Sequence, residues 1–245
     1  MRVFSRFLRW FVLPTAILLF ILSIPEMVHK NHGESEAIGS VRDGRLNNGF
    51  LLPWRGHNFT YFSFLSYYIL NYGYVHSTVH DIVIDAYQAC EYLTPGVRFK
   101  LMDCSRRRGG RMLVHWTHQN GTSVDFMVVK KDERGEQHRL LDRTGLFHYG
   151  LGFDEDGRST LLRNVTVDFE TMGIHILALA DAAEAHGMRI RKIIMKVEYL
   201  DELFATSSGR EIRDREIFIV PRLPDVVNDV HDDHYHVDFV FTDID

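Results

Sequence analysis

The sequence predicts an α+β fold in which flanking helices cover a mostly antiparallel sheet. Two stretches repeat apolar residues at helical spacing, and four others are rich in Val, Ile and aromatic residues, which is typical of strands. The predicted helices and strands do not alternate regularly along the chain, which favours the α+β class. With 45% hydrophobic and 25% charged residues, the chain has the composition of a globular protein with a sizeable core.

Residues 1–29 are predicted to be an N-terminal signal anchor or signal peptide and not part of the fold. Three arginines within residues 2–9 precede the uncharged run FVLPTAILLFILSIP, and a basic flank before an apolar core is the pattern of an export signal. The run alone is shorter than the ~20 residues that span a bilayer, but residues 10–28 approach that length. No clear cleavage site follows, so an inner-membrane anchor is favoured over a cleaved signal. Both alternatives predict a periplasmic domain, by the positive-inside rule.

The remaining chain is expected to be a linker followed by one domain. Residues 30–48 are polar, contain glycine and show no periodicity, so the linker is assigned there and the domain to residues 49–245. The aromatic segment FTYFSFLSYYIL is expected to pack in the core, with the lining of a groove as the alternative. A helix is predicted from Val79 to Leu93, with Ser77 or Thr78 as its N-cap.

The second half of the domain supplies another helix and the strands. Asp168 can cap a helix whose apolar stripe runs from Phe169 to Ala183, and Gly187 lies where a left-handed stop is expected. DEDGR at 154–158 predicts a turn. The predicted strands are Ser123–Val129, Arg191–Glu198, Glu216–Val220 and Tyr235–Phe241.

The net charge and the cysteine content limit the possible partners and the possible disulfides. A net charge of −5 argues against nucleic acid as a partner, because phosphate backbones bind basic faces, and the cationic run RRRGGR at 106–111 is too short to change this. Cys90 and Cys104 are the only cysteines. An exported protein could join them in a disulfide, or they could be two separate buried thiols.

Two histidine-rich stretches point to a metal site. In HDDHYHVDFVF, residues 231–241, strand alternation places His234, His236 and Asp238 on one face and apolar residues on the other. In HWTHQNGTSVDF, residues 115–126, Gly121 permits a sharp turn, so His118 can fold back towards Asp125. Two histidines and one carboxylate leave a fourth tetrahedral position for water, which is typical of catalytic zinc, although manganese and iron accept the same donors. The alternative is a polar strand face beside an ordinary Asn-Gly hairpin.

These stretches resemble a known family. GGRMLVHWTHQNGTSVDF and HDDHYHVDF look like the penicillin-insensitive murein endopeptidases, within the zinc peptidases that include lysostaphin-type enzymes, D-Ala-D-Ala carboxypeptidases and the hedgehog fold. The group's pattern is His-x6-Asp followed by a distant His-x-His. His118 to Asp125 and His234 to His236 fit that pattern. The chain departs from the family at Thr122, where leucine is usual, and in the membrane anchor that is one of the two predictions for its N-terminus.

The resemblance implies a role for each residue of the two stretches. It implies a hedgehog or D-Ala-D-Ala peptidase-like fold and Zn²⁺ as cofactor, bound by His118, Asp125 and His236. His234 would be the catalytic histidine. The subgroup's two further histidines correspond to His115 and His231, which would line the site and assist catalysis. Asp232, Asp233 and Asp238 could hold the imidazoles, although solvated acids are the simpler interpretation.

The function implied is a zinc-dependent murein endopeptidase that hydrolyses D-alanyl cross-links of peptidoglycan with water activated by the metal. Its substrate and partner would be the peptidoglycan peptide. A close alternative is a D,D-carboxypeptidase or dipeptidase acting on stem peptides, which needs a cation to bind a terminal carboxylate. Arg106–Arg108 and Arg111 are the candidates for that cation, and Arg111 is also a candidate oxyanion donor. A different class is a non-catalytic zinc module that binds the cell wall.

Overall fold

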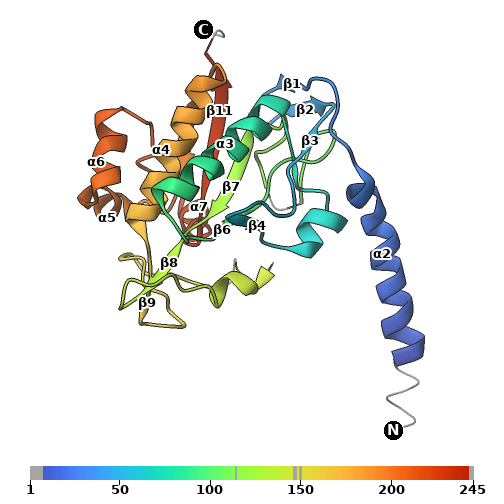
Figure 1. The fold of residues 1–245 in the computed structure, drawn as a ribbon, viewed down its shortest axis with the longest axis horizontal. Coiled ribbons are helices and arrows are strands. Elements are labelled where there is room, and N and C mark those ends of the chain that lie inside the picture. Colours follow the sequence, from blue (N-terminus) through green and yellow to red (C-terminus); the bar gives the residue numbers. More distant parts are fainter. Residues whose placement is uncertain (1–7, 114, 146–147, 149–150, 243–245) are drawn as a thin grey trace.

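The structure of the protein is a computed structural model that describes residues 8–113, 115–145, 148 and 151–242 (Figure 1). Helices and strands are mixed along the chain without regular alternation. In order, the elements are η1 (Leu8–Val12), α2 (Leu13–Val28), β1 (Glu36–Gly39), β2 (Gly44–Asn47), β3 (Phe50–Leu51), β4 (Phe59–Tyr61), η2 (Leu65–Ile69), β5 (Tyr74–Val75), α3 (Ser77–Leu93), β6 (Phe99–Leu101), β7 (Ser123–Met127), β8 (Lys130–Asp132), η3 (Leu141–Arg143), β9 (Val165–Val167), α4 (Phe169–Ala185), β10 (Met188–Ile194), α5 (Tyr199–Ala205), α6 (Ser207–Asp214), α7 (Asp225–Asp229) and β11 (His234–Phe241).

A five-stranded sheet forms the centre of the domain. Its strand order is β10-β11-β7-β6-β4, and every neighbouring pair is antiparallel except β4 and β6. This confirms the predicted α+β class with a mostly antiparallel sheet. β11 and β7 lie in the middle of the sheet, and their register places His236 opposite Asp125 and Tyr235 opposite Phe126. The two predicted histidine stretches are therefore hydrogen-bonded neighbours.

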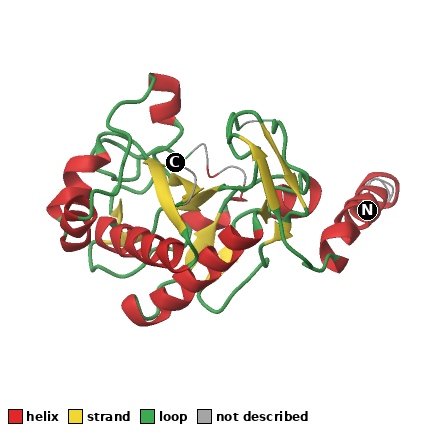
Figure 2. Cartoon of the chain, turned by 90° about the horizontal axis from the view of Figure 1, so that it is seen from above, coloured by secondary structure: helices red, strands yellow, loops and turns green. Residues whose placement is uncertain are grey.

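One face of the sheet is covered by α3 and α4, which lie side by side (Figures 1 and 2). The hydroxyl of Tyr235 on β11 is 2.5 Å from Nδ1 of His175 on α4, and Tyr87 of α3 stacks on the same imidazole. Burial lowers the pKa of His175 to about 3, so this histidine is a neutral hydrogen-bond acceptor inside the core. The aromatic face of β11 thus belongs to the core, as strand alternation predicted.

Both predicted helices form, with one correction at a cap. The apolar stripe of α3 is buried from Val79 to Cys90, but its N-cap is His76, whose Nδ1 accepts from the Thr78 amide at 3.1 Å. Neither Ser77 nor Thr78 is the cap, because the chain is already helical there. Asp168 caps α4 as predicted and Gly187 adopts a φ of +71° after it.

The predicted strands differ from the structure in two places. The strand expected at Arg191–Glu198 lies earlier, at Met188–Ile194, and contains an irregularity between Ile190 and Lys192. The segment Glu216–Val220 contributes only an isolated bridge between Ile219 and Ile193. Ile219 is buried beside β10, whereas Phe218 is exposed, and the segment does not continue the ladder. The turn at 154–158 forms as predicted, with Gly157 at a φ of +73°.

The segment expected to be a linker contains an ordered hairpin. Strands β1 and β2 pair antiparallel over residues 36–47, and the side chains of Val41 and Leu46 are buried. The Leu46 amide donates to the Arg108 carbonyl, and the Gln119 amide donates to the Val41 carbonyl. The hairpin therefore packs against the segment that contains His115 and His118, a consequence that polar composition alone did not indicate.

The N-terminal helix projects from the domain (Figures 1 and 2). Residues Trp10–Val28 are long and apolar enough to cross a membrane, and most of their side chains are exposed. This apolar N-terminal helix fits either a signal or an anchor. Its last turn contacts the domain through Glu26, whose carboxylate lies 3.4 Å from the Tyr74 hydroxyl.

The core settles two further expectations. In the aromatic segment, Tyr61, Phe62 and Tyr67 are buried as predicted, whereas Phe64 and Leu65 are exposed. Cys90 and Cys104 are both buried and both free. Burial raises the pKa of the Cys90 thiol to about 12, so this thiol is unreactive at neutral pH.

The buried Leu46 gives a test of whether the hairpin belongs to the folded domain. We expect Leu46→Ala to lower the free energy of unfolding by about 2–5 kcal/mol, because it leaves a cavity under the hairpin. Leu161→Ala, at a side chain that is 64% exposed, should change it by less than about 0.5 kcal/mol. Urea denaturation of both variants measures the difference, and equal effects would show that residues 36–47 are a loose linker.

Candidate metal centre

Three segments of the chain bring the predicted ligands together. β7 supplies Asp125, β11 supplies His236, and the turn before β7 supplies His118. The turn needs unusual backbone angles, because His118 itself has a φ of +68° and Gly121 one of +79°. A Cβ at Gly121 would meet the Leu46 side chain at 2.7 Å, so only glycine fits beneath the hairpin. The turn therefore folds His118 back over the sheet, as the sequence predicted.

The donor groups of the three residues form a compact triangle, in which Asp125 contacts each histidine through a different oxygen. His236 Nδ1 lies 2.8 Å from Asp125 Oδ1 and 3.1 Å from His118 Nε2, and His118 Nε2 lies 3.2 Å from Asp125 Oδ2. Tetrahedral coordination at zinc–nitrogen and zinc–oxygen distances of about 2.0–2.1 Å separates neighbouring donors by about 3.3 Å. The triangle has nearly that size, and all three side chains are buried. The residues present therefore fit a zinc ion.

Hydrogen bonds outside the triangle set the direction of the two imidazoles. His118 Nδ1 donates to the Ser123 carbonyl at 3.2 Å, and His236 Nε2 donates to Asp238 Oδ1 at 2.7 Å. When both rings are neutral, these bonds leave the lone pairs of His118 Nε2 and His236 Nδ1 on the side of Asp125, which is the tautomer that a metal requires. Within the described residues, Asp125 Oδ2 is a buried oxygen without a hydrogen bond. A cation is the partner that such an oxygen lacks.

The electrostatic balance of the triangle also favours a cation. Burial opposes the ionisation of Asp125, but the adjacent His118 and His236 outweigh it and hold the pKa of this carboxyl well below its usual value. Burial also opposes the charge on His236, but Asp238 and Asp125 raise its pKa to about 10. Two buried carboxylates thus draw a positive charge to this position, and a bound metal would replace the proton.

His115 lies beside the triangle at a greater distance. Its Nδ1 is 3.7 Å from Asp125 Oδ2, and donor atoms of His115, His118 and Asp125 all lie within 4.8 Å of one another. Its Nε2 donates to Asp103 Oδ2 at 2.9 Å. Burial works against the charged form of His115, but Asp103 and Asp125 outweigh it and raise its pKa. His115 is thus held as a hydrogen-bond donor at the edge of the metal position.

His234 is fixed by a chain of buried polar groups. Its Nδ1 donates to Asp233 Oδ1 at 2.5 Å, and Asp233 Oδ2 accepts from His148 Nδ1 at 2.5 Å. Lys130 Nζ lies 3.4 Å from His148 Nε2 and 2.8 Å from Asp142 Oδ1. These bonds place a proton on Nδ1 of His234, so Nε2 is the nitrogen that can accept one. Asp233 is fully buried, which corrects the expectation of a solvated acid.

His231 packs against His234 and is the last of the six predicted site residues. The centroids of the two rings lie 4.7 Å apart, and His231 Nδ1 donates to the Val227 carbonyl at 2.6 Å. Burial lowers the pKa of His231 to about 3, and the neighbouring His234 adds to that effect. His231 is therefore a neutral imidazole at neutral pH.

All six predicted site residues line one pocket of about 380 Å³. The hairpin, the turn before β7 and helix α7 form its walls. The other lining residues are Arg42, Trp116, Thr117, Ile194, Val226, Val227 and Val230. Trp116 and Val226 are exposed by 77% and 71%, so the mouth of the pocket is apolar. Among the described residues, Arg106–Arg108 and Arg111 are not part of this lining.

Several residues of the site were missed by the sequence analysis. Asp103 and His148 lie outside both histidine stretches and had no local signal. Lys130 begins β8 directly after the apolar residues Val128 and Val129, and a lysine in that position could have suggested a buried charge. Arg42 lies in the segment interpreted as a linker, so it was not considered as part of the pocket.

Comparisons with family models and with curated proteins do not place the chain in a family. A scan of the chain against protein-family models finds no match, and a search of curated proteins finds none either. The functional assignment therefore depends on the geometry of the six site residues and on the spacing of the two histidine stretches.

The hydrogen bond to Asp238 provides a test of the metal centre. We expect Asp238→Asn to weaken zinc binding about 10–100-fold, because it removes the carboxylate that orients His236. Asp232→Asn is the matched control, since Asp232 is also buried but accepts from the Phe153 amide instead. Competition titration with a chromogenic zinc chelator measures both affinities. Equal affinities in the two variants would contradict the assignment of His236 as a ligand.

Proposed function

We propose that the chain is a zinc-dependent murein endopeptidase that hydrolyses D-alanyl cross-links in peptidoglycan. The observation that supports this most strongly is the triangle of His118, Asp125 and His236 with His234 held in the same pocket. This is the arrangement expected of the murein endopeptidase family, with two histidines and one carboxylate as ligands and a further histidine beside them. The hedgehog or D-Ala-D-Ala peptidase-like fold is part of the proposal.

Zinc would supply Lewis acidity, which polarises a carbonyl and makes water nucleophilic near neutral pH. The remaining steps fall to residues of the chain. His234 can accept a proton at Nε2 and deliver it to the departing amine, because Asp233 holds its Nδ1 proton in place. Asp233 and His234 thus form a positioned acid–base pair, in which the carboxylate fixes the tautomer and stabilises the charged ring.

His115 and His231 have different roles in this proposal. His115 is held by Asp103 with its charged form favoured, so it suits the negative charge that develops on the carbonyl oxygen. His231 is neutral and held by the Val227 carbonyl, so it suits positioning of the substrate or of His234. Arg111 is exposed and outside the described pocket lining, and we do not retain it as an oxyanion donor.

The pocket walls suit a short peptide with a methyl side chain. Trp116 and Val226 provide exposed apolar surface at the mouth, against which alanyl methyl groups can pack. Arg42 extends from the hairpin into the lining and can pair with a carboxylate of the stem peptide. Because Arg42 could also bind a terminal carboxylate, a D,D-carboxypeptidase or dipeptidase is the second candidate.

The location proposed for this activity is the periplasm, with the domain tethered to the inner membrane by the N-terminal helix. The apolar length of Trp10–Val28 supports a tether, and the arginines before it support a cytoplasmic N-terminus. A tethered hydrolase would act on the wall nearest the membrane.

The role of His234 gives the first test of this proposal. We expect His234→Ala to lower the rate of hydrolysis of purified murein by about 10²–10⁴-fold, because general acid–base catalysis is lost. Zinc content should stay near one ion per chain, since His234 lies outside the triangle. His57→Ala, at a side chain that is 79% exposed, is the control. A wild-type protein that binds zinc but leaves murein intact would instead support the non-catalytic zinc module.

The substrate preference gives a second test. Cross-linked dimeric muropeptides should disappear while uncross-linked pentapeptides stay untrimmed, as measured by mass spectrometry of the digest. Arg42→Gln should raise KM about tenfold with little change in kcat, because it removes one charge-assisted contact to substrate. Trimming of pentapeptides without loss of dimers would overturn the endopeptidase in favour of the carboxypeptidase.

A further inference from the structure

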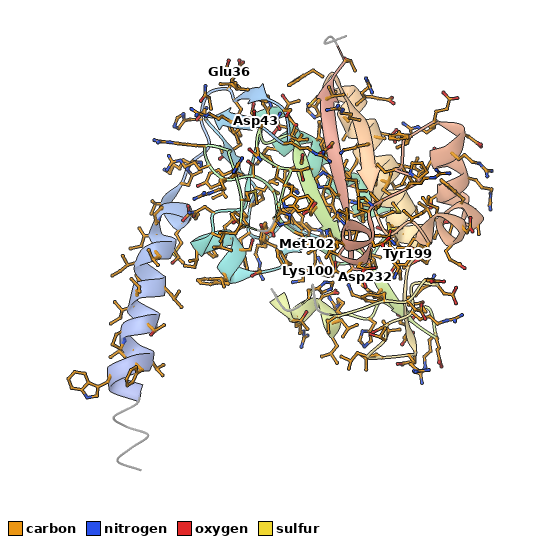
Figure 3. The ribbon with its side chains drawn as sticks, turned by 180° about the vertical axis from the view of Figure 1, so that it is seen from behind. Glu36, Asp43, Lys100, Met102, Tyr199 and Asp232 are labelled. Atoms are coloured by element: carbon orange, nitrogen blue, oxygen red, sulfur yellow. The ribbon has the colours of Figure 1, made fainter. Side chains whose placement is uncertain are left out.

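A second hollow, of about 540 Å³, lies away from the metal centre and is lined by cationic side chains. Its described lining shares no residue with the metal-site pocket. In Figure 3, Lys100, which lines this hollow, lies far from Asp43, which neighbours Arg42 at the other pocket. The cations of the hollow are Arg55, Arg98, Lys100, Arg139 and Arg143.

The fold gathers these cations from separate segments. Thr60 and Lys100 are partners in the parallel register of β4 and β6 and point to the hollow. Phe59 and Phe99, the partners before them, are buried in the core and also border the hollow. The guanidinium of Arg98 donates to the His57 carbonyl, and its backbone amide donates to Gln137 Oε1 at 2.9 Å. The wall of the hollow is therefore built by strand alternation and fixed by hydrogen bonds.

The positive charge of the hollow is not balanced by its own acids. Asp142 is the single carboxylate among the described lining residues, and it is buried with its Oδ1 at 2.8 Å from Lys130 Nζ. Burial lowers the pKa of Lys100, and the charges of Lys130 and Arg143 add to this effect while Asp142 opposes it. Five cationic residues thus line one hollow in a chain with a net charge of −5, and the four arginines are exposed, so an anion from solvent can reach them.

We propose that this hollow binds a phosphate-bearing anion. A tetrahedral dianion accepts hydrogen bonds from several directions, which suits a hollow lined by several guanidinium groups. The volume of the hollow is larger than a single carboxylate group would fill. It accommodates a phosphate together with the group that bears it. The phosphate could belong to a soluble compound or to the headgroup of an anionic phospholipid. The second source is geometrically accessible because α2 runs from the domain towards the end at which Lys100 lies (Figure 3).

The test uses the full chain, loaded with zinc, in nanodiscs of zwitterionic phosphatidylcholine. Inorganic phosphate is titrated into the sample and the heat of binding is measured. We expect saturable binding that weakens as the salt concentration rises. Arg55→Gln/Arg143→Gln should weaken it at least about tenfold, because two charge-assisted contacts are lost. Arg189→Gln/Arg191→Gln removes the same charge from exposed positions on β10 and should leave the affinity unchanged.

The two double variants distinguish phosphate bound in this hollow from phosphate bound at the metal centre. The two nanodisc compositions distinguish a soluble phosphate compound from a lipid headgroup. Phosphate held by zinc would be equally tight in both double variants, so equal affinities, or no saturable heat, would overturn the proposal. In nanodiscs containing phosphatidylglycerol, weaker apparent binding of added phosphate would identify the lipid headgroup as the ligand. Unchanged binding there would identify a soluble phosphate compound. If the first double variant does not fold, Arg139→Gln alone replaces it.

Discussion

The pairing of β11 with β7 is the interaction on which the site depends. Their register places His236 directly opposite Asp125 in the middle of the sheet. A slip of one residue would turn every side chain of β11 to the other face and send its histidines into the helical core. The apolar partners oppose such a slip, because Tyr235 is hydrogen-bonded to His175 beneath the sheet. The core under α3 and α4 therefore fixes the geometry of the candidate metal centre on the opposite face.

The same sheet also holds an unusual density of buried charge. Asp125, Asp233 and Asp238 are nearly inaccessible, and imidazoles, a lysine or a hydroxyl contact each of them. Such clusters stabilise a fold only when every member has a partner. Among the described groups, Asp125 Oδ2 has no hydrogen bond, and a cation in the triangle would be its partner. Metal binding and folding should accordingly be coupled in this chain.

Much of this arrangement was predictable from local sequence, and the remainder was not. Strand alternation in His234–Phe241 and the glycine turn before β7 predicted which side chains meet, because both are short-range rules. Asp103, His148 and Arg42 reach the site only through tertiary packing, so no spacing pattern indicated them. The sequence indicated a linker there because the two buried apolar residues of the hairpin, Val41 and Leu46, lie against distant segments that contain Arg108 and Gln119. The sequence did not indicate the cationic hollow either. Its arginines come from separate segments, and the net charge of the chain is negative.

The central claim is that His118, Asp125 and His236 share one zinc ion. X-ray absorption at the zinc edge tests this most directly on the full chain reconstituted with one equivalent of zinc. The account predicts a first shell of nitrogen and oxygen only, at about 2.0–2.1 Å, with the outer-shell scattering of imidazole rings. A sulfur shell at about 2.3 Å, or a spectrum of fully hydrated zinc, would contradict it.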